Sequence, residues 1–170
     1  PGIRIASGSL GQGISVAIGA ALAKKLNGDD KLVYALTGDG ELQEGQIWEA
    51  LMFAAAKKVD NLIVTVDWNN AQIDGSTQQV CDLGDLHAKF KAFGWEVLEM
   101  KGNVMEDVVF TLTQAQLKAK QGKPIVILMH TEMGFGVDFM MGTHKWHGSA
   151  PNDEQLAKAL AQLEETLGDY

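Results

Sequence analysis

Disulfides, membrane spans and an excess of positive charge are all missing from this sequence of 170 residues. Its single cysteine, Cys81, cannot form an internal disulfide, and a reducing cytoplasm is the expected location. No apolar run approaches the length of a membrane-spanning helix, so no membrane association is expected. The 14 Lys and Arg residues are outnumbered by 22 Asp and Glu residues. This balance argues against nucleic acid as a partner, because clustered positive charge is what holds a phosphate backbone.

The remaining composition is ordinary for one globular domain. Hydrophobic residues make up 46% and charged residues 21% of the chain, and its length allows a sizeable core. The sequence starts at Pro1 and enters a glycine-rich segment with no helix or strand before it. We therefore expect residues 1–170 to form a single domain that belongs to a longer domain or subunit.

Hydrophobic periodicity predicts helices and strands that alternate along the chain. Helices are expected at 13–26, 44–58, 86–93, 104–120 and 152–167, strands at 31–37, 61–67, 95–100 and 125–131, and long loops at 68–85 and 132–149. The strands are continuous apolar runs, as in a parallel sheet covered by helices. The predicted fold class is α/β, an open and mostly parallel sheet with helices on both faces. Ligands of such sheets bind at the carboxyl ends of the strands.

Two polar motifs follow neighbouring strands at this edge of the predicted sheet. In Gly38-Asp39-Gly40, two glycines let a ligand approach the backbone and the aspartate offers a hard oxygen. Alone, this tripeptide is a weak signal and favours a plain turn. The next strand ends in Asp67-Trp68-Asn69-Asn70, and Asn69 lies 69 − 39 = 30 residues after Asp39. One strand–helix–strand unit needs about that span, so the two motifs are expected to be neighbours.

Asp39 and Asn69 together predict a divalent metal site. Carboxylate and amide oxygens suit Mg²⁺ or Ca²⁺ equally, with phosphate oxygens, a main-chain carbonyl and water as further ligands. Such a metal would offset the net charge of −8 against a bound diphosphate. The helix after Gly40 is expected to point its N-terminus toward the same place.

The spacing of GDG and NN resembles the thiamine-diphosphate-binding motif, and the surrounding sequence resembles transketolase. The matching segments are GSLGQG at 8–13, GDGELQEGQIWEA at 38–50, NNAQIDG at 69–75 and WHG at 146–148. They run in the family's order from Pro1 to the last helix. More narrowly, the chain is similar to the amino-terminal, diphosphate-binding (PP-type) part that forms the small subunit of split transketolases.

This resemblance implies a thiamine diphosphate site with particular ligands. The side chains of Asp39 and Asn69 and the main-chain oxygen of Ala71 would hold Mg²⁺ or Ca²⁺, with Asn69 also among the cofactor-binding residues. Gly40 would lie against the diphosphate.

The resemblance also implies residues around the reacting part of the cofactor. Gly8, Ser9 and Leu10 would lie near the cofactor rings, although the family often has proline where this chain has Ser9. His147 would reach both the diphosphate and the substrate, as a cofactor-binding and catalytic residue. Glu44 and Glu49 match glutamates that form an acidic network between two active sites at the dimer interface.

Each of these residues also has a structural interpretation. Residues 8–13 could be a flexible helix entry, and Glu44 and Glu49 could be a solvated first turn favoured by the helix dipole. His144 is a rival for the role of His147. The remaining side chains of interest are expected to be structural or inert: His87, His130 and Cys81.

Finally, the resemblance implies that another polypeptide segment completes the site. Transketolases have substrate histidines upstream of GSLGQG, while a separate pyrimidine-binding domain supplies the cofactor-activating glutamate and phosphate-binding arginines. The expected partner is that domain or a C-terminal transketolase subunit, in a homodimer or heterotetramer. The implied reaction moves a two-carbon ketol unit from a ketose phosphate to an aldose phosphate. Alternatives are a component like deoxyxylulose-phosphate synthase or 2-oxoacid dehydrogenase E1, or a non-catalytic remnant acting in assembly.

Overall fold

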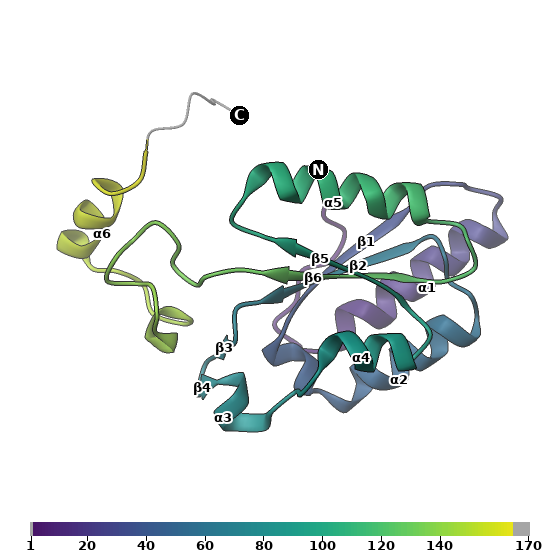
Figure 1. The fold of residues 1–170 in the computed structure, drawn as a ribbon, viewed down its shortest axis with the longest axis horizontal. Helices are drawn as coiled ribbons and strands as arrows, with labels where there is room; N and C mark the ends of the chain where they lie inside the picture. The colour runs from purple at the N-terminus through teal and green to yellow at the C-terminus, as the bar shows by residue number, and fades with distance from the viewer. Residues whose placement is uncertain (1, 165–170) are drawn as a thin grey trace.

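A four-stranded parallel sheet forms the centre of the molecule in the computed structural model, which describes residues 2–164 (Figure 1). Its strand order is β1-β2-β6-β5. The strands are β1 (Val33–Gly38), β2 (Leu62–Trp68), β5 (Glu96–Lys101) and β6 (Ile125–His130). Every adjacent pair is parallel, which confirms the predicted α/β class.

Helices cover both faces of this sheet, as the apolar strands predict. On one face lie α1 (Gln12–Leu26), α2 (Gly45–Ala56) and α4 (Leu86–Ala92), and on the other lies α5 (Met105–Lys118) (Figure 1). The larger core is formed by the three-helix face, with Phe90 fully buried in it. The smaller core joins α5 to β2, β5 and β6.

Asp60 connects three segments at the amino edge of the sheet. Its side chain accepts hydrogen bonds from Lys25 Nζ at 2.6 Å and from the Gly122 N–H at 2.9 Å. Its carbonyl oxygen accepts from the Lys120 N–H at 2.8 Å. The end of α1, the start of β2 and the turn before β6 are thereby held together. Within residues 2–164, no helix combines the length and apolar character needed to cross a membrane.

Two predicted loops contain regular structure that the sequence pattern did not reveal. Between residues 68 and 85 the chain forms a hairpin of β3 (Ala71–Gln72) and β4 (Gly75–Ser76), followed by α3 (Thr77–Cys81). The Ser76 hydroxyl accepts from the Gln79 N–H and so caps α3. The second loop contains one 3-10 turn, η2 (His144–Trp146). These elements are too short for hydrophobic periodicity to reveal them.

Two predicted helices differ from the observed ones. The helix expected at 44–58 is preceded by a 3-10 turn, η1 (Gly40–Gln43), and α2 itself begins at Gly45. The closing helix, α6 (Asp153–Leu160), is shorter than the expected 152–167. It ends in a turn where the Gln162 side chain bonds to Asp138 instead of continuing on a helix surface. Residues 165–167 of that prediction lie outside the described residues.

The burial of Phe90 predicts a large effect of truncating it. Phe90→Ala would leave a cavity beneath Trp48 and Trp95, whose rings contact it. We expect the free energy of unfolding to fall by about 3–5 kcal/mol in urea denaturation. Phe110→Ala makes the same change on α5, where the side chain is 62% exposed, and is expected to cost less than about 1 kcal/mol. Equal losses in both variants would contradict the core assignment.

Candidate functional site

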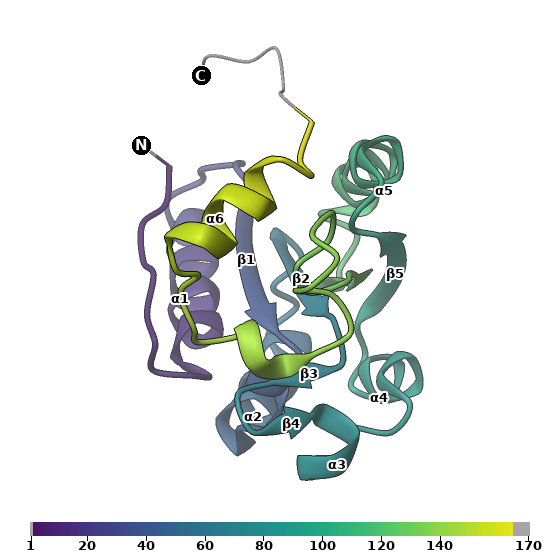
Figure 2. The same ribbon diagram turned by 90° about the vertical axis from the view of Figure 1, so that its left-hand side faces the viewer.

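The carboxyl ends of β1, β2 and β6 lie side by side and carry the polar motifs. Gly38 pairs with Asp67, and Trp68 pairs with His130. The β3–β4 hairpin and residues 132–164 gather at the same end of the sheet (Figures 1 and 2). The structure therefore brings Asp39 and Asn69 to neighbouring strand ends, as their spacing predicts.

Asp39 is a buried carboxylate that joins these two strand ends. Its side chain accepts hydrogen bonds from the Gly40 N–H at 2.8 Å and from the Asn70 N–H at 2.6 Å. Its own N–H donates to the Asp67 carbonyl oxygen at 3.0 Å. The residue is only 1% exposed, and this burial raises the pKa of the Asp39 carboxyl to about 6. A negative charge held there is stabilised by a cation close to the carboxylate.

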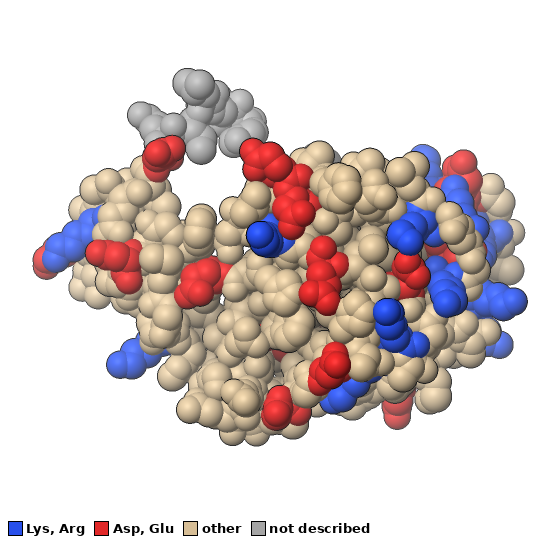
Figure 3. Space-filling view, viewed as in Figure 1, with Lys and Arg blue, Asp and Glu red and all other residues tan. Residues whose placement is uncertain are grey.

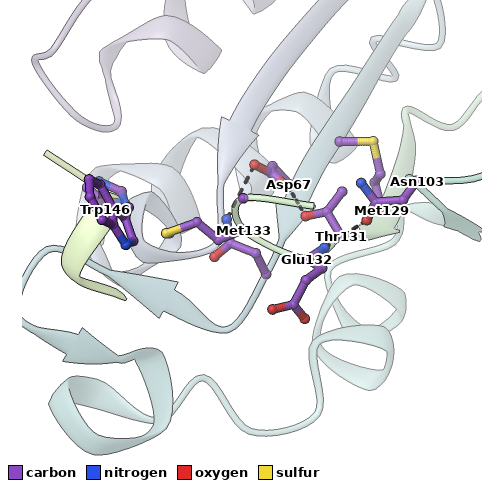
Figure 4. A pocket seen from close by; sticks show the side chains of 10 residues that line it. Asp67, Asn103, Met129, Thr131, Glu132, Met133 and Trp146 are labelled. Atoms are coloured by element: carbon purple, nitrogen blue, oxygen red, sulfur yellow. Dashed lines mark hydrogen bonds between the residues drawn. The ribbon is translucent and has the colours of Figure 1, made fainter. Parts of the chain in front are cut away.

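Asn69 is oriented by its own neighbours along the chain. Its Oδ1 accepts from the Ala71 N–H at 2.9 Å, and its Nδ2 donates to Asp67 Oδ2 at 3.5 Å. Asp67 in turn accepts a hydrogen bond from the Thr131 hydroxyl (Figure 4). Asn70 adopts a φ of 59°, and its side chain accepts from the Trp68 indole N–H. The Asn69 amide is thus part of a network that spans the ends of β2 and β6.

Gly40 lies directly against the β3–β4 hairpin. A Cβ atom at this position would be 2.8 Å from Gln72 Cβ, which is closer than real side chains approach. A Cβ at Gly38 would meet no atom within 4 Å. The second glycine of the motif is therefore required by packing, whereas the first leaves open space beside the backbone.

Two cavities open beside Asn69, and each is lined by one of the candidate histidines. A cavity of about 470 Å³ is lined by Asp67, Asn69, Thr131 and His147, together with Met133 and Trp146 (Figure 4). A second one, of about 400 Å³, is lined by Asn69, Ala71 and His144. Asn69, Glu132 and Met133 line both cavities. His147 and His144 therefore each line a cavity that Asn69 also lines.

The Gly8–Leu10 segment is attached to the other motifs through two side chains that the sequence pattern did not single out. Glu41 accepts from the Gly11 N–H at 2.8 Å, and Gln46 Nε2 donates to the Leu10 carbonyl oxygen at 2.7 Å. Gly8, Ser9 and Leu10 are themselves exposed. No local signal predicts the Glu41 contact, because its partner lies 30 residues away.

Other candidate side chains lie around this centre. Glu44 precedes α2 and Glu49 lies within it, and both side chains are exposed. His87 and His130 both bond to Glu99, at 2.7 Å and 3.2 Å, and these hydrogen bonds lower the pKa of the Glu99 carboxyl. The His130 ring also stacks on Trp68, with centroids 4.6 Å apart. His130 thus supports the strand that carries Asn69.

The oxygen types at these neighbouring strand ends are ones that a hard divalent cation accepts. Asp39 supplies one carboxylate, Asn69 one amide oxygen and Ala71 one carbonyl oxygen, all types that Mg²⁺ and Ca²⁺ accept. In the part of the chain that the structure describes, no three His, Cys, Asp or Glu side chains form a metal-binding cluster. Three protein oxygens leave coordination positions for phosphate oxygens, so metal and diphosphate would bind together.

Comparison with known families identifies this arrangement. The family model described as "Transketolase, thiamine diphosphate binding domain" matches residues 1–167. The chain belongs to the transketolase family. The resemblance of the GSLGQG, GDG, NN and WHG segments is thereby confirmed.

Similar sequences include proteins that are named as transketolase subunits. One of the subunits of an apulose-4-phosphate transketolase from Phocaeicola vulgatus is 41% identical over 167 residues, covering 98% of this chain and 59% of the relative. A 6-deoxy-6-sulfo-D-fructose transketolase subunit of a Clostridium species is 43% identical over 163 residues, covering 96% of this chain and 58% of the relative. The chain therefore spans less than two thirds of the length of these relatives.

Solved transketolases share the fold. The Campylobacter jejuni enzyme superposes with a TM-score of 0.85 at 37% identity, covering 95% of this chain and 26% of that structure. The Leishmania mexicana enzyme gives a TM-score of 0.84 at 35% identity, covering 95% of this chain and 25% of that structure. The sheet and its flanking helices are thus the transketolase diphosphate-binding architecture.

The raised pKa of Asp39 predicts that metal binding depends on pH. Because the folded-state pKa is about 6 rather than 3.8, a proton competes with the metal below pH 6, and affinity should fall about tenfold per pH unit there. Above about pH 7 it should be constant. Water-proton relaxation with Mn²⁺ alone measures this without the ionisation of a phosphate ligand.

Asp74→Asn is a matched control for this measurement, because Asp74 is exposed in the same hairpin. It should leave the pH profile unchanged, whereas Asp39→Asn should abolish tight Mn²⁺ binding at every pH. A wild-type profile that is flat between pH 5 and pH 7 would contradict Asp39 as the metal ligand.

Proposed function

We propose that this chain is the diphosphate- and metal-binding half of a transketolase that uses thiamine diphosphate. The observation that carries the proposal is the Asp39 carboxylate, held between two strand ends by the Gly40 and Asn70 N–H groups. Asn69 and Ala71, which directly flank Asn70 in sequence, would supply the further oxygens. A buried carboxylate anchored in this way is suited to a cation.

The charge distribution supports a metal-assisted mode of diphosphate binding. Lys24, Lys25 and Lys118 lie in the last turns of α1 and α5, which end at the amino edge of the sheet. In the view of Figure 3, most Lys and Arg atoms likewise gather toward that end of the molecule. Lys145, in η2, is an exposed cation at the carboxyl edge. Mg²⁺ or Ca²⁺ on Asp39 would supply the main positive charge for the diphosphate.

In this proposal, different residues at the carboxyl edge contact different parts of the cofactor. Asp39, Asn69 and the Ala71 carbonyl would bind the metal, and the backbone at Gly40 would lie along the diphosphate. Gly8, Ser9 and Leu10 would border the rings. When bound, thiamine diphosphate supplies the nucleophilic carbon for moving a two-carbon ketol unit. The contribution of this chain is to fix the reacting group in place.

His147 is the proposed proton-handling residue of this half. It is exposed at the larger cavity, beside Asn69 and Asp67, where its imidazole could reach both phosphate and substrate oxygens. Holding or moving a proton at the substrate oxygen is the ordinary role of such a side chain. His144 lines the neighbouring cavity and is the alternative for this role.

A partner that carries a pyrimidine-binding domain is part of the proposal. The relatives from Phocaeicola and Clostridium are named as subunits, and this chain spans under two thirds of each. Met52 and Phe53 are 60% and 46% exposed on α2, the helix that carries Glu49. Exposed apolar side chains one helical turn from Glu49 favour a protein interface there. We propose a homodimer or a heterotetramer with a C-terminal transketolase subunit, located in the cytoplasm.

The substrates are proposed only as a class, a ketose phosphate donor and an aldose phosphate acceptor. The two similar subunits are named for different sugars, so likeness to them does not select one substrate. The matching family model and the solved relatives are transketolases, which disfavours a component like deoxyxylulose-phosphate synthase or 2-oxoacid dehydrogenase E1.

Reconstitution tests this function directly. The chain is mixed with a C-terminal transketolase subunit, thiamine diphosphate and Mg²⁺, and ketol transfer between a ketose phosphate and an aldose phosphate is measured. Asp39→Ala and Asn69→Ala should each reduce activity and cofactor affinity by more than about 100-fold, because a metal ligand matters at least as much as its supports. Asp74→Ala, in the exposed part of the hairpin, should retain activity.

Two outcomes would overturn the proposal. One is cofactor binding that is equally tight in wild type and Asp39→Ala, measured by quenching of tryptophan fluorescence. The other is the absence of ketol transfer from an assembled complex that binds the cofactor, which would instead favour a non-catalytic role in assembly.

A further inference from the structure

We propose that Glu41 is a positioning residue that, together with Gln46, holds the Leu10–Gly11 peptide group against the Gly38-Asp39-Gly40 turn. This contact fixes the ring-side segment (Gly8–Leu10) relative to the diphosphate-side segment (Gly38–Gly40). The inference rests on the proposed function, because it assigns the Gly8–Leu10 segment to the cofactor rings. Neither Glu41 nor Gln46 is needed as a ligand in that function.

The first observation is that both polar atoms of one peptide group are held by these two side chains. The Gly11 N–H donates to Glu41 Oε1 at 2.8 Å, and the Leu10 carbonyl oxygen accepts from Gln46 Nε2 at 2.7 Å. These two backbone atoms belong to the same peptide plane. Binding it from both edges fixes its rotation, which neither hydrogen bond would do alone.

The second observation is that Glu41 also contacts the other motif. Its Oε2 accepts from the Gly38 N–H at 3.3 Å. Glu41 directly follows Gly40 in η1, so one short turn carries both the diphosphate-side glycine and the carboxylate that holds Gly11. Hydrogen bonds to a carboxylate are stronger than those between neutral groups. The ring-side and diphosphate-side segments are therefore joined through one side chain.

The third observation is steric. Gly11 has a φ of 82°, and a Cβ atom added to it would be 2.7 Å from Gln46 Cγ. The peptide therefore lies directly on the Gln46 side chain, and its positive φ favours glycine at position 11. Glu41 uses one carboxylate oxygen on Gly11, 30 residues away in sequence, and the other on Gly38, three residues before it. The contacts indicate a rigid connection rather than a helix entry that is free to move.

The test compares two ligands on the assembled holoenzyme. The affinity for thiamine diphosphate depends on both the ring-side and the diphosphate-side segments, whereas the affinity for inorganic pyrophosphate with Mg²⁺ depends only on the diphosphate-side segment. In Glu41→Gln, one of the two backbone N–H groups loses its acceptor, and in Gln46→Leu the Leu10 carbonyl loses its donor. Each variant should weaken thiamine diphosphate binding about tenfold, with pyrophosphate binding unchanged within about twofold.

Glu106→Gln is the matched control, because it makes the same chemical change at an exposed position in α5. It should leave both affinities unchanged. If Glu41→Gln does not fold, as judged by its thermal midpoint, Gln46→Leu carries the same comparison.

Two results would overturn the assignment of Glu41 and Gln46: equal weakening of both ligands, which indicates a general structural effect, or no change in either. Both require that the wild type binds thiamine diphosphate. If the wild type binds thiamine diphosphate no more tightly than pyrophosphate, the rings contribute nothing to the affinity, and this result would instead overturn the proposed function itself.

Discussion

The burial of one carboxylate, Asp39, is the constraint on which the rest of the site depends. Two backbone N–H groups hold it, one from its own turn and one from Asn70, just after the end of the next strand. These bonds require β1 and β2 to be in register, and the register in turn requires the packed helices on both sheet faces. The fold therefore places a charged oxygen where ordinary burial would favour a neutral one.

The burial of Asp39 makes the stability of the folded chain depend on pH. A carboxyl whose pKa is raised stabilises the folded chain when protonated, and this stabilisation is lost as pH rises from about 4 to 6. A divalent cation would reverse the loss by binding only the deprotonated form. An acidic chain with few cations at its carboxyl edge is thus suited to a ligand that arrives with its own metal. The acidity that excluded nucleic acid is consistent with this mode of binding.

Much of the fold was predictable from the sequence, because the main helices and strands are long enough to show hydrophobic periodicity. The approach of Asp39 to Asn69 was also predictable, since the span of one strand–helix–strand unit places consecutive strand ends together. The β3–β4 hairpin and the Glu41–Gly11 bond were not. The hairpin strands are two residues each, and the bond joins segments 30 residues apart. Such contacts exist only once the sheet has formed, so no local pattern records them.

The close approach of Gly40 to Gln72 bears on how this sequence can change over time. A side chain at position 40 would strike the hairpin whether or not any phosphate is present. With the proposed contact to the diphosphate, the small residue there would be under two independent pressures, one from cofactor binding and one from packing. A related protein that has lost the activity would be expected to keep Gly40 but not Asp39. The residue at position 39, and not the one at position 40, therefore indicates whether a distant relative is active.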